Sequence, residues 1–451
     1  MRSLGAGVLC LAVCVGTTRA AEVQEQPAPA PSPSPSPTPA APVAATPATP
    51  EPPKIKVGGQ IRLRPEYRNE LKADAAGGTT DTFIGERARA SVTVSGERVK
   101  AYVELQDARN WGTETSPTAN DRNVDLHQAF VNLPDLWLKG LSLQVGRQEL
   151  IYGDERLLGA LDWATTARSF DAGVARYAWR SGSLDALGAL VNDRKSAARG
   201  TGDVILSGAY ARFLRGKPGR ELDVYLLNLA DGARIAAELG EPGGLDSSRY
   251  TTTGVRARYG KTTGFLASGE GVLQFGHKGR DDHSAHALAL VAGYVFDRSH
   301  KPTLRFEFDQ ASGDGDAKDG KSKEFNNLFP TNHPFYGFAD LLGWRNMQAL
   351  RGTLALAPRE GQSLSLDFHK FRLMEAKGAW KDASGEVLGQ DPTGAAGRDI
   401  GTELDLSYRF PVRKELLMLL GYSAFFPGAF AETVRGDGTQ SFAYAQLLFR
   451  F

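Results

Sequence analysis

Charged side chains alternate with apolar ones along many short segments of this sequence. Residues 304–309 read LRFEFD, and residues 402–410 read TELDLSYRF. In a β-strand this period of two places the charges on one face and the Leu, Phe and Tyr side chains on the other. Such strands either pack as a soluble sandwich or close into a barrel whose charged face lines a lumen.

The charged face carries guanidinium and carboxylate groups, which can act in two ways. Arginine and carboxylate side chains on neighbouring strands can pair and stiffen a wall, whereas arginines in excess attract anions along a pore. We expect most of these charges to pair and a subset to select anions, namely Arg62, Arg64, Arg87, Arg89, Arg256 and Arg258. The full set that we predict to line the lumen is Arg62, Arg64, Arg87, Arg89, Glu104, Arg256, Arg258, Arg305, Asp309, Arg351, Glu403 and Arg409.

A second charged run connects two of the predicted strands. It reads GRQ at 146–148, YGDER at 152–156, DW at 162–163 and RSFD at 168–171. Its polarity predicts an external loop that folds inward and is pinned by hydrogen bonds between ionised Arg and Asp groups. The residues of this predicted loop site are Gly146, Arg147, Gln148, Tyr152, Gly153, Asp154, Arg156, Asp162, Trp163, Arg168 and Asp171.

Histidine and acidic residues elsewhere raise the question of metal or hydrolytic chemistry. His283 and His286 lack a third ligand at metal-binding spacing, and the acidic run 314–320 fails the spacing of a calcium loop. His369 has no serine in a context that suits a lipid hydrolase. We therefore expect no metal site, no cofactor and no enzyme activity.

The segments that would position these charges number about eighteen, an even count that suits a bacterial barrel. Their connections alternate between short turns, such as 96–97, and long polar loops, such as 150–168 and 312–345. We expect this alternation throughout, because outer-membrane barrels have short periplasmic turns and long external loops. The predicted fold is all-β, a transmembrane antiparallel β-barrel of about eighteen strands over residues 55–451.

The N-terminal residues predict export. A short apolar run followed by a small residue indicates a signal peptide over residues 1–20, and the Pro-rich residues 21–54 indicate a disordered linker. Both cysteines, Cys10 and Cys14, fall in the signal peptide, so the mature chain has no disulfide. The net charge of +1 gives no reason to expect a nucleic-acid partner.

Aromatic residues gather where descending strands enter the short turns, as Tyr177, Trp179 and Phe213 do. They predict a girdle at the interface with outer-membrane lipid. The last residues alternate up to Phe451 and resemble the C-terminal signal that the barrel-assembly machinery binds. We therefore expect the protein in the outer membrane of a Gram-negative bacterium.

The GRQ, YGDxR, DW and RSFD motifs, together with Arg62, Arg64, Arg87 and Arg89, resemble the alginate export family of outer-membrane barrels. The resemblance implies a barrel of about eighteen strands with an arginine-lined pore for a polyanionic polysaccharide. We therefore expect a channel that passes an anionic solute or polysaccharide. Two alternatives stay open, a structural barrel whose Pro-rich arm binds a periplasmic or envelope partner, and a general porin for small uncharged metabolites.

Overall fold

The structure is a computed structural model of the chain, and it describes residues 52–69, 80–113, 116, 124–192, 203–214, 218–231 and 248–451. The predicted signal peptide, residues 1–20, lies outside these residues, as does the Pro-rich linker up to residue 51. Within the described ranges, no helix is both long and apolar enough to cross a membrane.

Eighteen antiparallel strands form the wall of a barrel. They are β1 (Lys54–Asn69), β2 (Thr80–Ser95), β3 (Lys100–Asn110), β4 (Asp125–Leu133), β5 (Leu141–Gln148), β6 (Phe170–Trp179), β7 (Gly182–Asn192), β8 (Val204–Phe213), β9 (Arg220–Asp231), β10 (Ser248–Gly260), β11 (Gly264–Lys278), β12 (Asp281–Val295), β13 (Thr303–Ala311), β15 (Met347–Leu356), β16 (Ser363–Leu373), β19 (Asp399–Arg413), β20 (Leu416–Pro427) and β21 (Gln440–Arg450). The predicted all-β barrel fold is confirmed.

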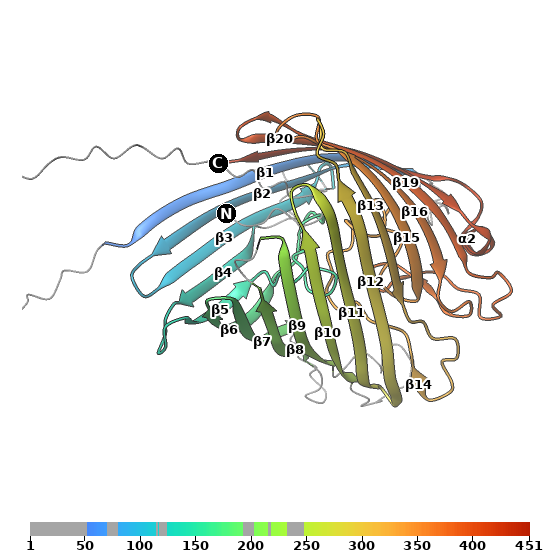
Figure 1. The fold of residues 1–451 in the computed structure, drawn as a ribbon, viewed down its shortest axis with the longest axis horizontal. Helices are drawn as coiled ribbons and strands as arrows, with labels where there is room; N and C mark the ends of the chain where they lie inside the picture. Colours follow the sequence, from blue (N-terminus) through green and yellow to red (C-terminus); the bar gives the residue numbers. More distant parts are fainter. Residues whose placement is uncertain are drawn as a thin grey trace, which may run out of the picture.

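The two ends of the sheet meet and close the barrel. β1 pairs antiparallel with β21 along the segment 60–68, and Figure 1 shows β21 in red beside β1 in blue at this seam. Gly59 and Phe451 exchange backbone hydrogen bonds of 3.0 and 3.2 Å there. Closure gives each described wall strand a partner on both sides, which satisfies the backbone groups that an open edge would expose.

Exposure alternates along the strands as the period of two predicts. On β13, Leu304 and Phe306 are exposed, whereas Glu307 and Asp309 are buried. The apolar side chains therefore point outward and the charged ones point into the lumen. An outward apolar band of this kind is stable when lipid replaces water around it.

One connection departs from the alternation that we expected throughout. β11 and β12 extend further than the sequence indicates and meet in a tight turn at Gly279 and Arg280, on the side of the long loops. Gly279 has a φ of 67°, which a glycine adopts without strain. The prediction of strict alternation is wrong at this point.

The long connections between the wall strands carry four short elements. These are β14 (Lys321–Ser322), which pairs with β12, the hairpin of β17 (Trp380–Lys381) and β18 (Val387–Gly389), and helix α2 (Ala429–Arg435). The connections 149–169 and 312–346 matter most for the lumen, and they are called the inward loop and the covering loop below.

Candidate functional site

The inward loop, residues 149–169, crosses the lumen of the barrel. It leaves β5 and returns to β6, yet its side chains and carbonyl groups contact β1, β2 and β3 on one wall and β10 and β13 on the other. Leu157 and Leu158 within it are buried. The sequence-based prediction that this charged loop folds inward agrees with these contacts.

Three arginines of the β1–β2 wall hold the middle of the inward loop. Arg62 donates to two carbonyl oxygens of the segment 162–164 at 2.7 and 3.0 Å, and Arg64 donates to the third at 2.7 Å. Arg87 donates to Asp162 Oδ1 at 2.8 Å. All three arginines are buried, so they face the lumen but lie beneath the loop.

Arg89 lies in a cluster of acidic groups beside these arginines. Its Nη1 is 3.8 Å from Glu104 Oε1, 3.8 Å from Glu149 Oε1 and 3.6 Å from Asp162 Oδ1. His127 Nε2 approaches the same Glu149 oxygen at 3.0 Å. One wall of the lumen therefore concentrates positive charge that the loop and its neighbours partly balance.

Arg156 fixes the opposite side of the inward loop to β13. Its guanidinium binds Glu307 and lies 3.3 Å from Asp309 Oδ2, and it donates to the hydroxyl of Tyr336 at 2.8 Å. The ring of Phe335 covers the same guanidinium at 4.0 Å. Burial alone would lower the pKa of Arg156, but the carboxylates of Asp309 and Glu307 raise it above its usual range.

The covering loop, residues 312–346, packs on the inward loop through backbone hydrogen bonds. Phe329 N donates to Leu157 O at 2.8 Å, and Gly159 N donates to Phe329 O at 2.9 Å. The hydroxyl of Thr331 donates to Glu155 Oε2 at 2.6 Å. Burial raises the pKa of Glu155, and the hydrogen bond from Thr331 offsets part of this shift.

Arg168 ties the two loops together near the end of the inward loop. It donates to Gly159 O at 3.2 Å and to Pro330 O at 3.0 Å. Burial lowers the pKa of Arg168 to about 10. Because both acceptors are neutral carbonyl groups, this arginine joins the loops without a carboxylate.

A stack of rings extends the contact from the wall into the covering loop. Arg64 lies 3.8 Å above the ring of Trp163, and His333 stacks on the other face of Trp163 at 3.7 Å. Phe338 stacks on His333 at 4.9 Å. His333 Nδ1 is 2.9 Å from Asp340 Oδ2. Trp163 of the predicted loop site therefore connects both loops to β1.

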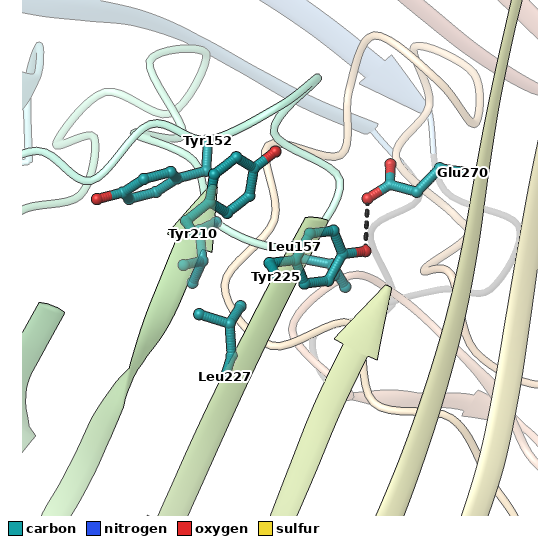
Figure 2. A pocket seen from close by; sticks show the side chains of 7 residues that line it. Tyr152, Leu157, Tyr210, Tyr225, Leu227 and Glu270 are labelled. Carbon is teal, nitrogen blue, oxygen red and sulfur yellow. Dashed lines mark hydrogen bonds between the residues drawn. The ribbon is translucent and has the colours of Figure 1, made fainter. Parts of the chain in front are cut away.

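A row of tyrosines lies where the inward loop meets β8 and β9. The rings of Tyr152 and Tyr210 are 4.6 Å apart, and those of Tyr210 and Tyr225 stack at 5.4 Å. Each hydroxyl donates to one carboxylate, at 3.1, 2.8 and 2.7 Å, and the acceptors are Asp185, Asp223 and Glu270. Figure 2 shows the small pocket between these rings and Leu157 and Leu227, with the bond from Tyr225 to Glu270 dashed.

Arg256 and Arg258 differ in their surroundings although both lie on β10. Arg256 is buried and binds Asp154 Oδ1 at 2.5 Å, Glu221 Oε2 at 2.8 Å and Asp223 Oδ2 at 2.9 Å. Burial alone would raise the pKa of Asp154, but the hydrogen bond from Arg256 lowers it below its usual range. Arg258 has a side chain that is 47% exposed and lies 3.9 Å from Asp154. Only Arg258 of this pair faces open solvent.

The remaining predicted residues line the wall formed by β13 to β19. Arg351 Nε donates to Asp367 Oδ1 at 2.7 Å and Arg351 Nη1 donates to Pro334 O at 2.7 Å. Glu403 accepts a hydrogen bond from Ala339 N at 2.9 Å, which fixes the covering loop. The two other arginines of this set are half-buried and lie toward the short-turn end of their strands, Arg305 on β13 and Arg409 on β19.

Arg147 and Asp171 do not take part in the inward loop. Arg147 lies on β5 and Asp171 on β6, and their side chains form an exposed ion pair of 3.3 Å on the outer face of the barrel. Gln148, between them, points inward and donates to Ala172 O at 2.8 Å. The prediction that every arginine and aspartate of the motif pins the loop is therefore wrong for this pair, because alternation turns both side chains outward.

Gly146 of the same motif is required by the backbone. Its φ is 130°, and a Cβ at this position would lie 2.2 Å from the carbonyl oxygen of Ala129 on β4. We expect Gly146→Ala to disturb the pairing of β4 with β5 and to destabilise the barrel by about 1–3 kcal/mol. Urea unfolding in detergent, followed by tryptophan fluorescence, measures the change. Gly173→Ala, where a Cβ meets open space, is the control. Equal unfolding midpoints for the two variants would contradict the argument.

Three further residues, outside the two predicted site sets, hold the loops. Gln106 donates to Thr166 O at 2.8 Å, and Thr331 and Tyr336 of the covering loop bind Glu155 and Arg156. Gln106 follows Glu104 by two positions on β3, so the alternation of the strand places both side chains on the lumen face. The loop residues gave no periodic signal.

Two of the histidines considered for metal or hydrolytic chemistry lie in ordinary polar contacts. His283 Nδ1 is 3.0 Å from Ser322 O and His369 Nε2 is 3.2 Å from Asp405 Oδ2. Among the residues that the structure describes, no group of three His, Cys, Asp or Glu side chains could hold a metal ion.

Comparisons with known proteins agree with this architecture. A family model described as alginate export matches residues 54–444. No curated protein matches the sequence. Among solved structures, OccK11 (OpdR) of Pseudomonas aeruginosa is 12% identical, with a TM-score of 0.56 over 88% of this chain and 96% of that chain. OpdK of the same species, solved with vanillate, is 10% identical, with a TM-score of 0.58 over 88% and 98%. OccAB4 of Acinetobacter baumannii is 10% identical, with a TM-score of 0.55 over 90% and 100%. At these identities the solved structures support the fold alone.

Proposed function

We propose, from the premise that this chain belongs to the alginate export family and is an outer-membrane channel of a Gram-negative bacterium, that it passes an anionic solute or polysaccharide along arginines of its lumen. Its family and fold are those of transport channels, so we assign the solute no covalent step. Movement needs only side chains that bind the solute weakly enough to release it.

The observation that carries this proposal is the placement of like charges on β1 and β2. Arg62 lies directly opposite Arg87 in the register, and Arg89 follows Arg87 by two positions on the same face. Like charges directly opposite on neighbouring strands destabilise a sheet. A wall built for stability alone would alternate the signs, so the excess of arginine here favours a role toward an anion.

Partly exposed arginines on the opposite wall also favour a lumen that attracts anions. Arg176 and Arg212 share a single buried carboxylate, that of Asp185, at 2.7 and 3.5 Å. Their side chains are 42% and 24% exposed, and Arg258 is exposed on the same wall. These three arginines therefore present guanidinium groups that an anion in the lumen can contact.

We also propose that Phe451, at the seam beside Gly59, belongs to a signal for the barrel-assembly machinery. We propose further that the Pro-rich residues 21–54 bind a periplasmic partner.

The proposal predicts the ion preference of the channel in planar bilayers. We expect wild-type protein to prefer anions under a salt gradient, and Arg87→Ala/Arg89→Ala to lose most of that preference, because two buried positive charges leave the lumen wall. The reversal potential measures the change.

Two variants control this experiment. Arg87→Lys/Arg89→Lys keeps the charge and should keep the anion preference. Arg147→Ala/Arg249→Ala removes two arginines from the outer face and should behave as wild type. A wild-type channel without anion preference would overturn the proposed function.

A further inference from the structure

We propose that Arg87 and Arg89 form a binding site for a carboxylate of the solute, and that Asp162 of the inward loop occupies this site until the solute displaces it. This inference rests on the proposed function, since it concerns the occupancy and regulation of the same arginines. The inward loop is thus a tethered competitor: its Asp162, which the chain holds near the site, competes with the solute for the two arginines.

The geometry at Asp162 is that of a bound anion. Its Oδ1 atom lies 2.8 Å from Arg87 Nη2 and 3.6 Å from Arg89 Nη1, so one oxygen faces two guanidinium groups. The arginine side chains are 1% and 5% exposed, whereas the Asp162 side chain is 39% exposed. The carboxylate therefore stands between the arginines and the solvent of the lumen, where an arriving anion meets it first.

Asp162 differs from the other carboxylates around Arg89 in how it is anchored. Glu104 is part of the β3 wall, and Glu149 lies at the base of the inward loop, next to β5. Asp162 lies within the loop, between the end of β5 at Gln148 and the start of β6 at Phe170, and belongs to neither strand. It is therefore the acidic group that can leave the arginines without a change in the wall.

The loop that carries Asp162 is held in an unfavourable backbone conformation. Glu155, Leu161 and Ala167 have φ angles of 63°, 50° and 57°. Residues other than glycine keep such angles only where their surroundings hold them. The hydrogen bond from Arg87 to Asp162 provides part of that hold, beside those from Arg62 and Arg64 to the backbone, so its loss to a solute would favour a relaxed loop.

The exchange also keeps the buried charges paired. A solute carboxylate that replaces Asp162 leaves Arg87 and Arg89 with an anionic partner at every stage, so no guanidinium is left buried and unpaired. The solute gains the site and the loop loses it in one step. Binding of an anion is thereby coupled to movement of the loop that crosses the lumen.

The test follows the exposure of the loop with a single thiol. Thr165 lies three residues after Asp162, and a water-soluble maleimide reports its accessibility in the Thr165→Cys variant of the full-length protein. The labelling is specific in a Cys10→Ala/Cys14→Ala background, because these are the two cysteines of the sequence. Trigalacturonate serves as the anionic probe and maltotriose as a neutral sugar of the same length.

We expect trigalacturonate, but not maltotriose, to speed the labelling about tenfold, since a charge-assisted contact is exchanged. Adding Asp162→Asn should speed labelling by a similar factor without the probe and abolish most of the further effect of trigalacturonate. Asp171→Asn makes the same chemical change on the outer face and should leave the labelling unchanged.

The outcomes separate this inference from the proposed function. Slow labelling of the Asp162→Asn variant, or no effect of trigalacturonate on a channel that still prefers anions, would overturn the tethered competitor and leave the proposed function standing. A channel without anion preference would overturn the proposed function. Fast labelling of Asp162→Asn in such a channel would show that Asp162 holds the loop but does not compete with a solute, which also overturns the inference.

Discussion

Oxidation of a Gly85→Cys/Thr165→Cys variant is expected to close the channel to large anions, and reduction is expected to reopen it. Gly85 lies on the inner face of β2, and a Cβ placed there would be 3.3 Å from Thr165 Oγ1 of the inward loop. Thr165 Oγ1 marks the position that the sulfur of an introduced cysteine can take, so the two thiols of the double variant lie close enough to bond. A disulfide at this point fixes the loop across the lumen. We expect the trigalacturonate current to fall by about tenfold or more, because the open state is no longer accessible.

The same molecules provide the reference state for this experiment. Bilayer recordings before and after addition of a reductant compare the locked and free loop in one preparation. The single variants Gly85→Cys and Thr165→Cys should not respond to the reductant. Equal trigalacturonate currents in the oxidised and reduced double variant would show that the solute passes without movement of the inward loop.

The wall of the barrel could be predicted from the sequence because its information is local. A strand such as β13 alternates Leu304, Arg305, Phe306 and Glu307, and each residue needs only its neighbours to reveal its face. The β11–β12 hairpin was missed for the opposite reason. The polar residues around Gly279 read as a loop, although the strands continue through them to a tight turn.

The inward position of the arginines was predicted, but their contacts were not. Arg62 binds carbonyl groups that are 100 and 102 positions away, and carbonyl groups carry no side-chain signature. A sequence therefore shows that Arg62 faces the lumen and cannot show that a loop covers it. The outward pair of Arg147 and Asp171 shows a similar limit of sequence-based prediction. The motif gives the residue types, but the position of each residue in the alternation of its strand decides whether its side chain points inward or outward.

The tyrosine row was within reach of sequence reasoning. Tyr210 and Tyr225 lie at inner positions of β8 and β9, directly opposite each other in the register. Strand phase alone places both in the lumen. The contribution of Tyr152 from the inward loop requires the tertiary fold, since no period relates a loop residue to the strands that it meets.

Replacement of Arg156 by methionine is expected to release the inward loop from β13. Arg156 is buried, and its removal takes from the buried Glu307 its closest ion pair and leaves Arg351 at 3.7 Å. Loss of one partner from a buried ionic cluster costs about 3–5 kcal/mol. This cost falls on the closed position of the loop, because the wall strand itself keeps its backbone pairing. Cleavage within the inward loop by proteinase K should therefore become faster by about a hundredfold or more.

Arg147→Met is the matched control for this variant, because it removes an arginine of the same motif from an exposed ion pair on the outer face. An exposed pair contributes about 0–1 kcal/mol, so its loss should change the cleavage rate little. Equal cleavage rates in the two variants would mean that Arg156 does not hold the loop, and that the hydrogen bonds from Arg62, Arg64 and Arg87 suffice. Faster cleavage in Arg156→Met alone would show that the inward loop needs its attachment to β13 even while Arg62, Arg64 and Arg87 still hold its middle.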